Sequence, residues 1–363
     1  MAALAARPGA GRCASMTALA VVAAVMAAVA TSATAHRRYK GHGRRLGRAF
    51  DPLALLDGYP TGQEPLLSPA ALQAALPPGL ACGAVVPNTS HVVDCGWGRP
   101  GRVPPGTIAF QPRRVGGAPP PPRDRTTLLF LHGQSSAPLT QYLPLVVGLL
   151  STPASAGLRL LMPIAPRVTA LRVGAVDGAD GGAAAWMNLY VPPPAGVAAA
   201  EAATNDTQRV AIATAHPWAM DSLDLALSVT RLRRIAAFEV ASGRRVAVVG
   251  HSLGAGAALH LTALSPPDTF AAVLAVAGPL PLADEYVAGT LSSAGRGGVV
   301  LLHGTADTTI PASAGRVGAA VWGDGARFRA VEGASHAGVL GTPPMVEEVG
   351  VLLGRACAVP GQT

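Results

Sequence analysis

The chain has 363 residues, of which 50% are hydrophobic and only 13% are charged. This composition excludes an intrinsically disordered protein and allows one large hydrophobic core or two small ones. The formal net charge of +8 does not indicate nucleic-acid binding, because the basic excess lies mostly in a tail. No acidic residue precedes Asp51, whereas Lys and Arg crowd residues 36–48.

Residues 1–35 have the layout of a secretory signal peptide. Two arginines precede an apolar stretch at residues 14–30, and residues 33–35 (A-T-A) offer a small-residue cleavage site. An uncleaved membrane anchor and an organelle transit peptide are the alternatives. We therefore expect a secreted or endomembrane protein. Its basic tail, residues 36–48, is either solvated or in contact with an anionic membrane surface or wall polymer.

Residues 36–125 form an extension that is rich in Pro, Gly and Arg. Two short β-like runs, at residues 91–94 and 107–111, predict a hairpin at the edge of a sheet. Residues 119–122 are four consecutive prolines, which cannot donate ladder hydrogen bonds and predict a stiff connector.

Cys82 and Cys95 lie close together in this extension. In an oxidising compartment they would form a disulfide worth about 3 kcal/mol by the chain-entropy argument, and two ordinary thiols are the alternative. Asn88 and Asn205 each begin a glycosylation sequon, so a secreted chain would be a glycoprotein. Because the sequence has no C-x-x-C pair or His/Cys cluster, we expect no metal site.

From residue 126 to residue 357 the pattern alternates between strand and helix. Short apolar runs predict strands at residues 127–131, 158–162, 246–249, 271–276, 299–302 and 327–331. Helices are predicted at residues 141–150, 217–241, 255–264, 312–321 and 344–356. Strands separated by helices predict one α/β domain, with a mostly parallel central sheet that helices cover on both faces.

Two segments of this domain need separate predictions. In the long helix, Pro217 suits the first turn, and one side is predicted to carry Leu223, Leu227, Leu232, Ile235 and Phe238. Residues 171–216 lack any periodicity. They are either a loop or lid near a substrate site or a surface insertion.

Residues 250–254 read G-H-S-L-G and follow an apolar β-run directly. A G-x-S-x-G pattern between a strand and a helix is typical of a nucleophile elbow, a tight turn that pushes a serine hydroxyl outward. Gly250 and Gly254 suit this turn because a Cβ would collide with the crowded strand and helix. The pattern therefore predicts Ser252 as a nucleophile.

A serine nucleophile needs a base, and the base needs an orienting acid. Asp307 and His336 each follow a predicted strand, in the chain order Ser, Asp, His that accompanies such elbows. The carboxyl ends of parallel strands share one sheet edge, so we expect these side chains to meet Ser252 there. The alternatives are a helix cap for Asp307, a surface role for His336, and Asp324 as the acid.

The negative oxygen that forms during acyl transfer requires N–H donors. The backbone N–H of Leu253, at the start of the helix after the elbow, is the first candidate. The second is the N–H of Gln134, in the loop that follows the strand predicted at residues 127–131. His132 is a candidate for the substrate pocket or a second base, although bracing of this loop is the simpler interpretation.

Residues 126–357 resemble the phospholipase/carboxylesterase group of α/β-hydrolases, which includes the acyl-protein thioesterases. The matching features are L-F-L-H-G at residues 129–133, A-P-R-V-T at 165–169, Trp186, P-L-P-L at 279–282 and L-H-G-T-A-D-T-T-I-P at 302–311. The resemblance implies an α/β-hydrolase fold and cleavage of carboxylic esters or thioesters without a cofactor. It also makes Trp186 a candidate for the substrate pocket.

These patterns together predict a serine esterase with the triad Ser252, His336 and Asp307. Its substrates would be small-molecule or lipid esters with an apolar acyl group, including lysophospholipids and thioesters. The alternatives are acetyl or feruloyl esters of polysaccharide, transfer of the acyl group to an alcohol, and a non-catalytic binding protein that keeps the fold.

Overall fold

The computed structural model describes residues 126–357, except 136–137, 152–154, 156, 169–182, 188–193, 219, 221, 294–295 and 297. It also describes residues 76, 82, 84–86, 89, 91–94 and 107–112. The predicted signal peptide, basic tail and four-proline connector lie outside these residues. The described residues include the G-H-S-L-G motif and the predicted hairpin before the α/β region.

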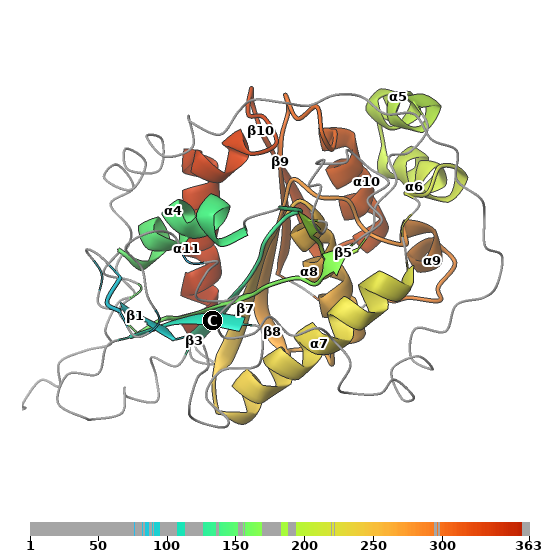
Figure 1. Cartoon of the computed structure of the whole chain (residues 1–363). Helices are drawn as coiled ribbons and strands as arrows, with labels where there is room; N and C mark the ends of the chain where they lie inside the picture. Colours follow the sequence, from blue (N-terminus) through green and yellow to red (C-terminus); the bar gives the residue numbers. More distant parts are fainter. Residues whose placement is uncertain are drawn as a thin grey trace, which may run out of the picture.

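One eight-stranded sheet forms the centre of the molecule (Figure 1). Its strands, in spatial order, are β1 (His91–Asp94), β2 (Thr107–Pro112), β4 (Arg159–Pro163), β3 (Thr126–Leu131), β7 (Arg245–His251), β8 (Phe270–Val276), β9 (Val299–Gly304) and β10 (Ala326–Val331). The pairs β1–β2 and β2–β4 are antiparallel, and all others are parallel. This strand order is that of the α/β-hydrolase fold, so the predicted fold class and the edge hairpin are confirmed.

Helices cover both faces of the sheet, as Figure 1 shows. The helices α4 (Pro138–Leu150) and α11 (Pro343–Cys357) lie on one face, and α7 (Ser222–Ala241), α8 (Leu253–Leu264) and α10 (Ala312–Trp322) lie on the other. Alternate residues of the central strands enter two separate cores. In β3, Leu129 and Leu131 face the α8 side, whereas Leu128 and Phe130 face the α11 side. Burial on both faces explains why these strands are continuously apolar.

The segment predicted to lack periodicity contains two helices, α5 (Pro194–Ala202) and α6 (Asp206–Ala215), which pack against α10. Asn205 caps α6, because its side chain accepts a hydrogen bond from the N–H of Gln208 at 2.9 Å. The prediction was wrong here for a physical reason. Alanine favours helix without adding apolar contrast, so an Ala-rich helix leaves little pattern in the sequence. The two-residue strands β5 (Arg167–Val168) and β6 (Ala183–Ala184) form a small separate sheet.

The long helix α7 also differs from its prediction. It begins at Ser222 rather than at Pro217, and Leu223 is 42% exposed. The buried side of the helix instead carries Leu225, Ala226, Ser228, Val229, Leu232, Ile235, Ala236 and Glu239. Leu232 and Ile235 are buried as predicted, whereas Leu227 and Phe238 are only half-buried. The buried side includes the polar residues Ser228 and Glu239, which a count of apolar residues alone does not place there. The short helix α9 (Ala283–Val287) and the 3₁₀ turn Gly338–Gly341 were not predicted.

Cys82 is disulfide-bonded. Cys95 lies outside the described residues, so the pairing of these two cysteines stays a prediction.

Within the described parts of the chain, no helix is long and apolar enough to cross a membrane.

A buried ionic cluster ties the amino ends of three parallel strands to α7. Glu239 is fully buried, and its carboxylate lies 3.2 Å from the guanidinium of Arg159 and 3.6 Å from that of Arg244. The hydroxyl of Thr127 donates to the same carboxylate at 2.6 Å. A buried charge of this kind is tolerated only while its partners remain in place.

Replacing Glu239 by Gln should therefore lower the free energy of unfolding by about 3 kcal/mol, because the buried guanidinium of Arg159 would lose the carboxylate that lies 3.2 Å from it. Urea denaturation measures the change. Glu201→Gln on the exposed side of α5 is the matched control and should shift stability by less than about 0.5 kcal/mol. Equal midpoints for the two variants would contradict the prediction.

Candidate active site

Three side chains meet where β7, β9 and β10 end. Ser252 directly follows β7, Asp307 follows β9 by three residues, and His336 lies in the loop after β10. The Nε2 atom of His336 lies 2.9 Å from the Oγ atom of Ser252, and its Nδ1 atom lies 2.7 Å from Oδ2 of Asp307. The structure thus brings together residues that are 84 and 29 positions apart in the sequence.

Ser252 has a backbone conformation that few residues adopt, with φ 57° and ψ −123°. The turn is crowded on both sides. A methyl group on Gly250 would overlap the carbonyl oxygen of Gly254, and one on Gly254 would overlap that of Leu131. The turn is held from β8 as well, because the N–H of Ser252 donates to the carbonyl of Val276 at 2.8 Å. These contacts force the serine side chain out of the strand.

Asp307 is held as a carboxylate by four donors. Its Oδ1 atom accepts the backbone N–H groups of Thr309 and Ile310, at 2.8 and 2.9 Å. Its Oδ2 atom accepts from His336 and lies 3.2 Å from Nε2 of His303. Burial alone would raise the pKa of Asp307, but the hydrogen bonds from His303 and His336 lower this pKa well below its usual range. The ionised acid fixes the proton of His336 on Nδ1, which leaves Nε2 facing the serine.

His303 is a site residue that the sequence analysis missed. It is buried at the end of β9, and its Nε2–H lies 2.7 Å from the carbonyl oxygen of Ile310 while also approaching Asp307. Its only signal in the sequence was its position four residues before Asp307. Asp324, the alternative acid, is exposed in the turn after α10 and lies outside this network.

Two backbone N–H groups beside Ser252 have no acceptor within the described part of the chain. They belong to Leu253, the first residue of α8, and to Gln134. The loop with Gln134 passes close to the serine, since a methyl group on Gly133 would lie 2.9 Å from Cβ of Ser252. The N–H of Gly133 itself is occupied, because it donates to the hydroxyl of Tyr142 at 2.9 Å.

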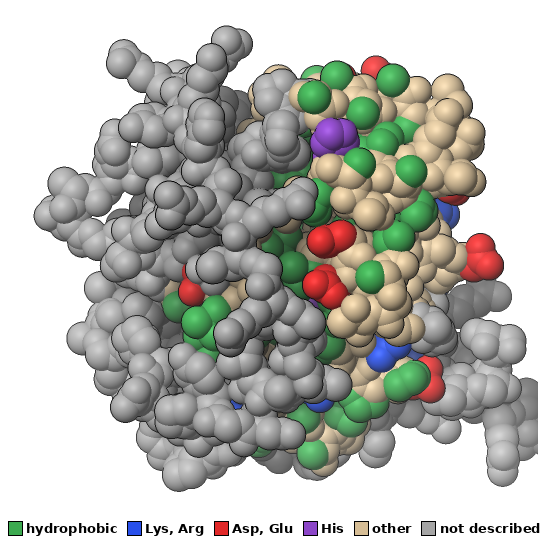
Figure 2. All heavy atoms as spheres, turned by 90° about the vertical axis from the view of Figure 1, so that its right-hand side faces the viewer, with side chains coloured by type: hydrophobic (Ala, Val, Ile, Leu, Met, Phe, Trp, Pro, Cys, Tyr) green, Lys and Arg blue, Asp and Glu red, His purple; other side chains and the backbone are tan. Residues whose placement is uncertain are grey.

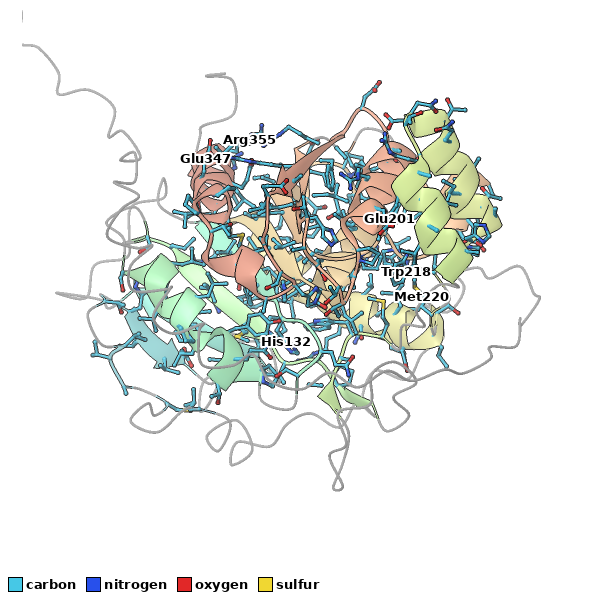
Figure 3. All side chains as sticks on the ribbon, turned by 90° about the horizontal axis from the view of Figure 1, so that it is seen from above. His132, Glu201, Trp218, Met220, Glu347 and Arg355 are labelled. Atoms are coloured by element: carbon cyan, nitrogen blue, oxygen red, sulfur yellow. The ribbon has the colours of Figure 1, made fainter. Side chains whose placement is uncertain are left out.

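His132 and Trp186 do not line an open pocket. For Trp186 this contradicts the prediction, whereas for His132 it agrees with the simpler interpretation that this residue braces its loop. Both are fully buried. The ring of His132 accepts the N–H of Ala165 at 3.0 Å and donates to the carbonyl of Gly133 at 2.6 Å, and burial lowers its pKa to about 4. The indole of Trp186 donates to the carbonyl of His132 at 2.7 Å. These residues brace the loop with Gln134, and Figure 3 labels His132 among closely packed side chains.

A cavity lies below α5 and α6, and its lining is mostly apolar. It is formed by side chains from α5, α6, α10 and the segments between them, including Val197, Ile212, Trp218, Leu280 and Val317. Figure 2 shows the outer surface on this side of the molecule, where few of the coloured side chains are Lys or Arg. The cavity does not include Ser252 or His336 among its lining residues, but the segment that leads to Leu280 begins against the elbow. A methyl group on Gly278 would overlap the carbonyl oxygen of Ser252.

Within the residues that the structure describes, no three His, Cys, Asp or Glu side chains are grouped so that they could hold a metal ion.

The chain matches no protein-family model and no curated protein.

Solved structures similar to this chain include SOBER1 from Arabidopsis thaliana, with a TM-score of 0.46 and 18% identity over 64% of this chain and 100% of that one. Another is acyl-protein thioesterase 2 from Zea mays, with a TM-score of 0.45 and 18% identity over 69% and 99% of the two chains. A phospholipase/carboxylesterase from Dyadobacter fermentans has a TM-score of 0.37 and 14% identity over 63% and 88%. The names of the last two belong to the group that the sequence motifs resemble.

The conformation of Ser252 predicts an unusual order of stability. Ser252→Gly should be more stable than Ser252→Ala by about 1 kcal/mol, because glycine tolerates a positive φ that strains an alanine. Urea denaturation of both variants measures the difference. Ala237→Gly on the exposed side of α7 is the control. In an ordinary helix glycine is less stable than alanine, so this change should lower the free energy of unfolding by about 1 kcal/mol. An alanine variant at least as stable as the glycine variant would show that this turn is not strained.

Proposed function

We propose that this protein is a serine hydrolase that cleaves carboxylic esters. The observation that carries the proposal is the unbroken chain of hydrogen bonds from Asp307 through His336 to Ser252, at 2.7 and 2.9 Å. Such an arrangement supplies a nucleophile, its base and the group that orients the base. The N–H groups of Leu253 and Gln134 beside the serine, which have no acceptor among the described residues, add donors for the oxyanion.

The reaction begins when Oγ of Ser252 attacks the ester carbonyl carbon and Nε2 of His336 accepts the hydroxyl proton. The carboxylate of Asp307 stabilises the imidazolium that results, and the N–H groups of Leu253 and Gln134 bind the oxyanion. The tetrahedral intermediate then collapses. Its bond to the alcohol oxygen breaks, and His336 donates the proton to the leaving alcohol.

Hydrolysis of the acyl-enzyme repeats these steps with water as the nucleophile. His336 takes a proton from the water as its oxygen bonds to the acyl carbon, and the bond to Oγ of Ser252 then breaks. The proton returns to Oγ, and the carboxylic acid leaves. All of the groups required are side chains or backbone groups of this chain, so the proposed cycle needs no cofactor.

We propose acyl esters with an apolar acyl group as substrates, including lysophospholipids and thioesters. Support comes from the mostly apolar cavity lined by α5 and α6, which includes Leu280, two residues after the Gly278 that lies against the elbow. Short acetyl or feruloyl esters of polysaccharide are the alternative. Each added methylene buried by an apolar site contributes about 0.8 kcal/mol, so the two alternatives predict opposite trends with acyl length.

The first test is hydrolysis of p-nitrophenyl esters of graded acyl length. The wild-type protein should show kcat/KM rising from acetyl to longer esters, because the cavity buries additional methylenes. Ser252→Ala should lose at least about 10³-fold in kcat, since the nucleophile is removed. Ser242→Ala, an exposed serine just after α7, is the matched control and should keep wild-type activity.

Two results of this test would reject the proposal in different ways. Equal activity of the wild-type protein and Ser252→Ala would reject the mechanism, and so would a folded wild-type protein that reacts with neither an ester nor a fluorophosphonate probe. The latter outcome would favour a binding protein. A rate that rises with added alcohol, with an ester as the product, would indicate an acyltransferase instead.

The role of Asp307 gives a second test. Asp307→Asn should lower kcat by about 10⁴-fold with little change in fold, because the amide cannot hold the proton of His336 on Nδ1 or stabilise the imidazolium. Asp324→Asn is the control, since Asp324 is exposed in a turn outside the site, and its kcat should equal that of the wild type. Esterase kinetics at one pH measure both, and comparable losses in the two variants would contradict the assigned role.

A further inference from the structure

A second chain of hydrogen bonds runs behind the three site residues. The N–H of Gly133 lies 2.9 Å from the hydroxyl of Tyr142, and this hydroxyl lies 2.7 Å from Nδ1 of His251. The other ring nitrogen of His251, Nε2, lies 3.0 Å from the backbone carbonyl oxygen of His336. The chain therefore joins the loop after β3, the elbow and the loop of His336 through two side chains, those of Tyr142 and His251.

The direction of each hydrogen bond follows from the groups involved. A carbonyl oxygen can only accept, so Nε2 of His251 carries a proton and donates to His336. Burial lowers the pKa of His251 to about 3, so the ring is neutral and its Nδ1 atom must accept. Tyr142 consequently donates its hydroxyl proton to His251, and its oxygen accepts the N–H of Gly133. Only one arrangement of protons satisfies all three contacts.

Both side chains are sealed from solvent, because Tyr142 is 1% exposed and His251 is 2% exposed. Burial also raises the pKa of the Tyr142 hydroxyl, which therefore keeps its proton. The ring of His251 stands 5.0 Å from that of His336 and meets the ring of Tyr142 edge-on at 5.6 Å. Water cannot easily replace either partner there, so loss of one group leaves another unpaired.

The chain fixes the loop that presents the N–H of Gln134. The peptide group between His132 and Gly133 is held at both ends, by the indole of Trp186 on its oxygen and by Tyr142 on its N–H. The carbonyl of Gly133 is held by the ring of His132. Since the N–H of Gln134 belongs to the same planar peptide group as this carbonyl, its direction is fixed too.

From this geometry we infer that Tyr142 and His251 are positioning residues. They fix two groups relative to each other: the oxyanion donor, which is the N–H of Gln134, on one side of Ser252, and the backbone of His336 on the other side. Neither side chain touches the reacting atoms. The inference rests on the proposed esterase function, because it assigns these residues to the same site and the same reaction.

The test compares Tyr142→Phe, which keeps the ring, with His251→Phe, which replaces the imidazole by a somewhat larger apolar ring; both remove the hydrogen bonds. Each should lower kcat by about 10- to 100-fold and leave KM within about threefold, because a misplaced donor affects the transition state more than ground-state binding. The double variant should lose little more than one single variant, since both break the same chain. Esterase kinetics and fluorophosphonate labelling rates provide the two readouts.

Tyr286→Phe is the matched control. Tyr286 is also buried and also lies by a buried histidine, with its hydroxyl 3.3 Å from Nδ1 of His260, but this pair lies away from the three site residues. The control should keep wild-type kcat. His251→Gln adds a conservative variant, because its amide can still donate to the carbonyl of His336, and it should retain more activity than His251→Phe.

The inference is overturned if folded Tyr142→Phe and His251→Phe keep wild-type kcat, or if Tyr286→Phe loses as much as they do. If His251→Phe does not fold, Tyr142→Phe alone decides, because it keeps the ring: kcat and labelling rate both equal to the wild type would overturn the inference, and a selective loss of kcat would support it. A wild-type protein without esterase activity would reject the proposed function itself. If instead the wild-type protein and the variants are all active with equal kcat, only the inference about Tyr142 and His251 is overturned.

Discussion

The hydrogen bond between Asp307 and His336 is the interaction on which the rest of the proposed site depends. It holds the imidazole proton on Nδ1 and so directs Nε2 toward Ser252. The carboxylate remains ionised because two backbone N–H groups and two histidines surround it in a buried position. Without this acid, the strained serine would face an imidazole of undefined tautomer, and the neighbouring N–H groups would have no attacking nucleophile to assist.

The two ends of the parallel strands differ: stabilising contacts lie at the amino ends, and the loops of the proposed site lie at the carboxyl ends. At the amino ends, Glu239 joins α7 to the starts of three strands through a buried ionic cluster. At the carboxyl ends, the chain leaves the sheet in the loops that carry Ser252, Asp307 and His336. The stabilising contacts at the amino ends allow the strained conformation of Ser252, and N–H groups without an acceptor among the described residues, to persist at the carboxyl ends. The chain through Tyr142 and His251 extends this rigidity to the loops themselves.

The sequence could predict those parts of the site that depend on local pattern and chain order. A predicted strand ends shortly before each of Ser252, Asp307 and His336. This was enough to predict that the three residues lie at one edge of the sheet. The contacts of His251 could not be predicted in this way, because its partner Tyr142 lies 109 residues away. Helices α5 and α6 were not predicted because alanine gives no apolar contrast. Trp186 was predicted in the substrate pocket because its position in a motif does not reveal that it is buried.

The most direct measurement is a crystal structure of the protein after reaction with an alkyl fluorophosphonate. The account predicts phosphorus bonded to Oγ of Ser252, and a phosphoryl oxygen within about 3 Å of the N–H groups of Leu253 and Gln134. The imidazole of His336 should still contact Asp307. An adduct on another residue, or a phosphoryl oxygen turned away from both N–H groups, would contradict it.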